Sequence, residues 1–111
     1  MKVVDAGEKL GMKLLAGGEG LNKELTGVYI CDLLSWVMSH GKKGDAWITV
    51  QTHSNIIAVA VLLELGCVIV PEGIEVEAET LQKAENEGIP VFQSNHSAYE
   101  LAKELYKMGI E

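Results

Sequence analysis

The feature that most constrains this chain is an alternation, from residue 26 onward, of short β-branched runs with amphipathic helical segments. The runs span residues 26–31, 46–50, 67–70 and 90–93, and the helical segments span 33–41, 56–65, 78–88 and 97–108. Strands and helices that alternate over short links form right-handed βαβ units. We therefore predict a three-layer α/β/α sandwich with a mainly parallel sheet, built as a single domain over residues 1–111. Ahead of it, residues 3–11 predict a weak helix and residues 12–16 a short strand.

The central unit, residues 45–66, points to a candidate site. Its strand is apolar enough to be buried on both faces, and its helix is apolar at helical spacing and ends at Gly66. Between them lies a polar segment, residues 51–55. Ligands of open α/β sheets bind where strands end and helices begin, so we expect the site at this edge. The helix that starts near Asn55 is expected to offer free N–H groups to an anion.

Parallel strands bring further polar residues to the same edge. The predicted ligand-binding residues are Asp32, Gln51, Thr52, His53, Asn55, Glu72, Gly73, Ser94, Asn95 and His96.

Several of these residues also fit purely structural roles. Asp32, Ser54 or Asn55, and Ser97 are candidate helix N-caps, and Ser97 with Glu100 matches a capping box. Glu72 and Gly73 are also consistent with a turn after Pro71. The histidines show no HxH or HxxxH spacing, so no metal is predicted, and no GxSxG supports a serine hydrolase.

Composition and charge exclude some function classes. The 111 residues carry a net charge of −7, which argues against nucleic acid because phosphate binding needs clustered Lys and Arg. The longest apolar run, residues 56–63, is too short to cross a bilayer. The glycines at residues 17–20 match no phosphate-binding motif, and no cofactor is predicted. Two cysteines without a CxxC pair indicate free thiols; with no apolar leader after Met1, a cytoplasmic protein is expected.

Six segments together are similar to a stand-alone DRTGG domain. They are residues 27–38, 47–53 and 55–60, Ala84, residues 88–91 and residues 97–99. The resemblance implies a fold like the N-terminal domain of HPr kinase/phosphorylase. It also implies a regulatory partner of the kind found with adenine-nucleotide-sensing enzymes and iron-only hydrogenase systems. The literal Asp-Arg-Thr-Gly-Gly motif is absent, and the phosphate-loop catalytic domain of HPr kinase is not present, so kinase activity is not implied.

The leading hypothesis is a non-catalytic regulatory module that binds a small anionic ligand, such as an adenine nucleotide. A protein-interaction subunit that docks a larger enzyme is the alternative. A small hydrolase or phosphotransfer enzyme with His53 or His96 as general base is a weaker third reading.

A homodimer is also predicted, because the central helix is apolar on both sides. Its outer side carries Ala58, Val61, Leu62 and Leu65, and soluble monomers rarely expose such a surface.

Overall fold

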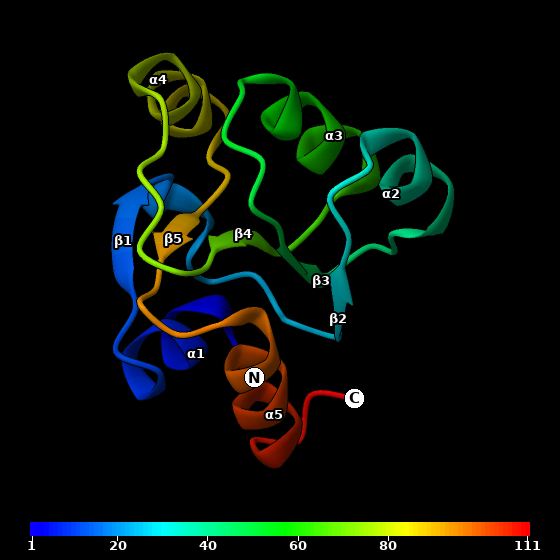
Figure 1. Cartoon of the computed structure of the whole chain (residues 1–111), viewed down its shortest axis with the longest axis vertical. Helices are drawn as coiled ribbons and strands as arrows, with labels where there is room; N and C mark the ends of the chain where they lie inside the picture. The colour runs from blue at the N-terminus through cyan, green and yellow to red at the C-terminus, as the bar shows by residue number, and fades with distance from the viewer.

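A computed structural model describes all 111 residues and contains five strands and five α-helices (Figure 1). The strands are β1 (Lys13–Ala16), β2 (Gly27–Ile30), β3 (Asp45–Ile48), β4 (Cys67–Val70) and β5 (Val91–Gln93). The helices are α1 (Val3–Lys9), α2 (Leu34–His40), α3 (Asn55–Leu63), α4 (Ala78–Glu87) and α5 (Ala98–Lys107), with a short 3₁₀ turn at Gly18–Gly20. The predicted alternation of strands and helices is confirmed.

The five strands form one sheet in the order β1-β5-β4-β3-β2. Strands β2 to β5 are parallel to one another, and β1 pairs antiparallel with β5, with a register shift between Leu14 and Ala16. The predicted mainly parallel α/β fold is therefore confirmed. The parallel strands follow one another in sequence order, so the connections through α2, α3 and α4 all run in the same direction across the sheet.

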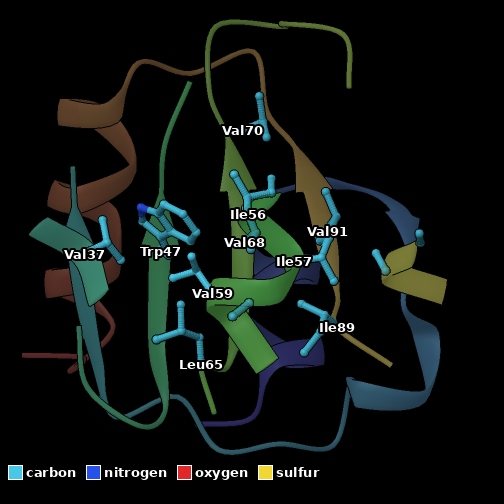
Figure 2. Close-up of a cluster of buried hydrophobic side chains, with 13 residues drawn as sticks. Val37, Trp47, Ile56, Ile57, Val59, Leu65, Val68, Val70, Ile89 and Val91 are labelled. Carbon is cyan, nitrogen blue, oxygen red and sulfur yellow. The ribbon is translucent and has the colours of Figure 1, made fainter. Parts of the chain in front are cut away.

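Helices cover both faces of the sheet, with α2, α3 and α4 on one face and α1 and α5 on the other (Figure 1). Successive strand residues point to opposite faces, so Trp47 joins the core under α2–α4, whereas Ala46 and Ile48 join the core against α1 and α5. Figure 2 shows the first core, in which Trp47, Val68 and the α3 residues pack together. Both faces of β3 and β4 are thus buried, as their apolar runs predict.

Local signals at two helix ends are confirmed. The side chain of Ser97 accepts a hydrogen bond from the Glu100 N–H, and the Glu100 carboxylate accepts one from the Ser97 N–H, completing the capping box of α5. Gly88 ends α4 in the left-handed conformation with φ of 66°.

The end of α3 differs from the prediction. The helix ends at Leu63, and Glu64, rather than Gly66, takes the left-handed position with φ of 55°. The early turn directs Leu65 into the core, where its side chain has 0% exposure. The prediction that Leu65 lies on the exposed side of the helix was therefore wrong, whereas Ala58, Val61 and Leu62 are exposed.

No helix of this chain is long and apolar enough to span a lipid bilayer. Both cysteines are free thiols: Cys67 is buried and Cys31 is partly buried.

Candidate functional site

The carboxyl ends of β2, β3, β4 and β5 lie along one edge of the sheet, because these strands are parallel. The ten predicted site residues all follow these strands, so the fold places them at this edge, as expected. The strand order never reverses within the parallel part, however. Crevices between diverging crossover helices arise where it does reverse, so this edge has no such crevice.

The Asp32 side chain bonds to residues at the end of β3 and does not cap α2. Its Oδ1 accepts hydrogen bonds from the Thr49 hydroxyl at 2.8 Å and from the Val50 N–H at 2.9 Å. The Gln51 side-chain amide donates to the Asp32 carbonyl at 2.9 Å, and the Gln51 N–H donates to the Thr49 hydroxyl. The N-cap of α2 is Leu33, without a side-chain hydrogen bond, so the N-cap reading of Asp32 was wrong. The carboxylate instead ties the end of β2 to the end of β3.

The segment before α3 combines satisfied and free backbone donors. The Asn55 N–H donates to the His53 Nδ1 at 3.2 Å, and the Ile56 and Ile57 N–H groups donate to carbonyls at His53 and Ser54. The expectation of free donors in the first turn of α3 was therefore wrong. Ser54 stands at the N-cap position without a side-chain cap, and the His53 ring takes that role. The free donors lie one step earlier, since the N–H groups of residues 52–54 donate no hydrogen bond within the chain.

Thr52 joins the start of α3 to the start of α4. Its carbonyl accepts a 2.6 Å hydrogen bond from the hydroxyl of Thr80, which is fully buried, and its own hydroxyl donates to Glu77 at 3.4 Å. The loop that carries His53 is thus attached through Thr52 to the start of α4.

The remaining predicted residues form a separate group at the ends of β4 and β5. The Glu72 N–H donates to the His96 carbonyl at 2.9 Å, and the Gly73 N–H donates to the Ser94 carbonyl at 2.8 Å. The Ser94 hydroxyl accepts from the His96 N–H. Asn95 lies against this turn, since a Cβ on Gly73 would stand 2.9 Å from the Asn95 Oδ1. Most of these bonds use the backbone, which leaves the His96 and Asn95 side chains exposed to solvent.

The ten residues share an edge but not a pocket. No hydrogen bond joins the group around Asp32 to the group around Ser94, and His96 makes its one side-chain ion contact with Glu100, at 3.7 Å. None of the four surface hollows is lined by any of the ten residues. The largest hollow, about 590 Å³, lies at the opposite edge and includes Lys23 and Lys43.

Sequence reasoning missed the residues that hold this edge together. Thr49 and Thr80 are buried hydroxyls that bond Asp32 and the Thr52 carbonyl, and the Gln93 amide donates to the Ile74 carbonyl at 2.8 Å. The role of Thr49 could have been predicted in part from the sequence. Thr49 continues a buried apolar strand, and a buried polar side chain needs a hydrogen-bond partner.

Metal-binding side chains do not gather at this edge. No group of three or more His, Cys, Asp or Glu side chains is placed to hold a metal ion. Burial raises the pKa of the Cys67 thiol to about 12, and the Ser97 N–H lowers the pKa of the Glu100 carboxyl. The edge therefore presents amide, imidazole and N–H groups to water rather than an enclosed reaction chamber.

Residues 6–108 match the family model of the DRTGG domain, so the chain belongs to the DRTGG domain family. A solved structure that covers the CBS and DRTGG domains of the regulatory region of Clostridium perfringens pyrophosphatase, complexed with its activator diadenosine tetraphosphate, has the same fold. The TM-score is 0.70 and the sequence identity 17%, over 92% of this chain and 44% of that one. A comparison with curated proteins finds no match.

Proposed function

We propose that this chain is a non-catalytic regulatory module that binds an adenine nucleotide at the carboxyl edge of its sheet. The observation that carries the proposal is the likeness, over 92% of the chain, to a regulatory region that was solved with a dinucleotide activator. That region is more than twice as long as this chain, so its activator comes to this protein only as a proposal.

The proposed contacts begin at the segment before α3. The N–H groups of residues 52–54 donate nothing within the chain, and they stand at the positive end of the α3 dipole, which favours phosphate oxygens. The side chains of His53 and Asn55 are exposed beside these N–H groups, and the side chain of His96 is exposed farther along the same edge; all three can donate hydrogen bonds. Asp32 and Glu72 add negative charge to the same edge, so we expect the nucleotide to bind as its Mg²⁺ complex.

Isothermal titration calorimetry with ATP, ADP, AMP and diadenosine tetraphosphate, each with Mg²⁺, tests the proposal. Inorganic phosphate and an acyl phosphate extend the series to simpler anions. We expect His53→Ala and Asn55→Ala each to weaken binding by about tenfold, which corresponds to ~1.4 kcal/mol. The matched control is Lys23→Ala, which removes a cation beside the 590 Å³ hollow at the opposite edge. Loss of binding in Lys23→Ala, with His53→Ala unchanged, would place the ligand there instead. No binding in the whole series would end the nucleotide proposal.

A second candidate function is a subunit that docks a larger enzyme. The exposure of several large apolar side chains supports it, among them Leu33, Trp36 and Leu62. The sequence resemblance adds a specific partner, an iron-only hydrogenase system, as a proposal. Co-purification from a native lysate tests docking: a stoichiometric enzyme partner lost in Trp36→Ala or Leu62→Ala supports it, and recovery of the chain alone contradicts it.

The enzymatic alternative has weaker support. His53 Nδ1 already accepts the Asn55 N–H, and His96 stands beside Glu100 in open solvent, so neither ring faces an enclosed substrate site. Turnover of acyl phosphates or nucleotides that disappears in His53→Ala or His96→Ala would establish this alternative.

We also propose that the protein is a homodimer in the cytoplasm. Ala58, Val61 and Leu62 form an exposed apolar group on the outside of α3, and a 320 Å³ hollow adjoins them. Light scattering of the purified chain at micromolar concentration tests the dimer. A mass near 12.0 kDa, that of one chain, would contradict it.

A further inference from the structure

The two outer strands of the sheet differ in how well their free edges are protected. β1 carries Lys13 and a register irregularity, and both features discourage pairing with another strand. β2, at the other end of the sheet, reads Gly-Val-Tyr-Ile and has no charge, no proline and no bulge. No strand lies beyond it (Figure 1). The edge of β2 is therefore not paired with any further strand, and the carboxyl-terminal Glu111 lies beside Gly27 at its amino end.

Hydrogen bonds of the ladder show which groups face outward. The Thr26 N–H donates to the Gly44 carbonyl, and in a parallel ladder alternate residues turn to the same neighbour. Val28 and Ile30 therefore bond to β3. Gly27 and Tyr29 direct their N–H and C=O groups away from the sheet.

Helix α2 flanks this open edge with exposed aromatic and apolar side chains. Leu33, just before the helix, and Trp36 and His40 within it lie at helical spacing on one side, and the Trp36 and His40 rings stack with centroids 4.1 Å apart. His40 lines a hollow of about 480 Å³ together with Gly27, Val28 and Tyr29, so this side of α2 stands beside the edge of β2. Leu33 is 62% exposed, Trp36 52% and Ile30 48%. About half of each of these side chains is therefore exposed in the single chain.

We propose that a second copy of this chain pairs its β2 antiparallel with this β2, which joins the two sheets into one and packs α2 against the partner's α2. The inference rests on the proposed homodimer, but it assigns the interface to β2 and α2 instead of the outer side of α3. A twofold axis perpendicular to the sheet keeps both α2 helices on the same face, so their exposed sides meet beside the axis. The apolar side chains of each copy thereby cover those of the other.

Charge selects the register of the pair. Lys42 and Lys43 lie at the amino end of β2, where the Thr26 hydroxyl donates to the Lys43 carbonyl, and Asp32 lies two residues beyond its carboxyl end. Pairing Tyr29 with the partner's Tyr29 sets the partner's Asp32 opposite Thr26, beside both lysines. The hollow there has room for the partner's chain as it leaves its strand; it is lined by Asp45 and Glu111 as well as by the two lysines, and Lys43 pairs with Glu64 at 3.4 Å. The same pairing occurs twice in the dimer, and it gives the adjacent lysines a role in a chain of charge −7.

Size-exclusion chromatography with light scattering of selected variants tests the interface. We expect Trp36→Lys, Ile30→Asp and the double variant Lys42→Glu/Lys43→Glu each to raise the dimer dissociation constant at least about tenfold. Lys83→Glu, a charge reversal on α4, is the matched control and should leave the dimer unchanged. Circular dichroism establishes that each variant is folded.

Amide hydrogen exchange provides a readout specific to the joined sheet. The Tyr29 N–H should exchange at least about tenfold more slowly in the wild-type dimer than in Trp36→Lys, because only strand pairing gives it an acceptor. A dimer that dissociates in Leu62→Glu but persists in Trp36→Lys and Ile30→Asp, with no Tyr29 protection, would overturn this inference and leave the homodimer intact. A wild-type monomer at 100 μM would overturn both, while the nucleotide proposal would still be decided by calorimetry.

Discussion

Replacing Asp32 by serine separates two roles that this residue could have. Serine and aspartate cap helices about equally well, so if Asp32 were the N-cap of α2 the change would be nearly neutral. In the structure the carboxylate instead reaches across to β3, where its Oδ1 accepts the Thr49 hydroxyl and the Val50 N–H. The serine hydroxyl is too short to make either contact.

The expected loss of stability follows from the two donors that Asp32→Ser leaves without an acceptor, the Thr49 hydroxyl and the Val50 N–H. Thr49 is 1% exposed, so its hydroxyl hydrogen would be buried without a partner, at a cost of about 1–3 kcal/mol. Val50 is exposed, and its N–H can bond to water, so it adds only about 0.5–1 kcal/mol. We expect Asp32→Ser to lower the free energy of unfolding by about 2–3 kcal/mol. Asp32→Asn keeps the accepting oxygen and should cost about 1 kcal/mol or less.

Urea denaturation monitored by tryptophan fluorescence measures both variants. With a slope of about 1–2 kcal/mol per molar urea, Asp32→Ser should lower the midpoint by about 1–3 M. A double-mutant cycle with Thr49→Val should give a coupling energy of at least about 1 kcal/mol. If Asp32→Ser lies within about 0.5 kcal/mol of the wild type, Asp32 does not hold the ends of β2 and β3 together.

Three further predictions concern backbone conformation, pH and thiol reactivity. Gly17→Ala should lower the free energy of unfolding by at least about 3 kcal/mol, because at φ of 82° the new Cβ would overlap a backbone carbonyl of the loop before β5. Gly11 has φ of 61° and no atom within 4 Å of a new Cβ, so Gly11→Ala should lower it by only about 1 kcal/mol. The same urea assay measures both. The pKa of Glu100 is lowered in the folded state, so its stabilising effect is complete above its unfolded pKa and is lost as the pH falls through the lowered value. The difference in unfolding free energy between the wild type and Glu100→Gln should therefore shrink as the pH falls from 6 to about 3, and a constant difference would contradict this. Iodoacetamide at pH 8 should alkylate Cys31 but not Cys67, whose pKa is raised to about 12, and mass spectrometry should show two additions only after unfolding in urea.

Much of the architecture could be predicted from local sequence. The β-branched run around Trp47 and the helical spacing after Asn55 identify a buried strand and its helix, because periodicity depends only on neighbouring residues. The capping box at Ser97 and the left-handed Gly88 are equally local, and both were predicted correctly. Alternating strands and short links then determine the parallel sheet, since each βαβ unit has one favoured hand.

The partners of individual polar residues depended on tertiary structure. Asp32 finds Thr49, 17 residues away, only because β2 lies beside β3, and nothing near Asp32 in the sequence distinguishes that contact from a helix cap. Leu65 is buried because the helix ends early, at Leu63, and the chain turns at Glu64. The apolar helical pattern continues to Leu65, so the sequence does not show this early end.

The sequence by itself thus determined which segments become strands and helices and that polar residues gather at one edge of the sheet. Tertiary structure decided the strand order, and with it that this edge has no cleft and that β2 has an open side. The physical reason is the separation along the chain of the residues that interact. Helix and strand periodicity follows from bonds within a few residues, whereas strand order and pockets follow from the packing of segments far apart in the chain.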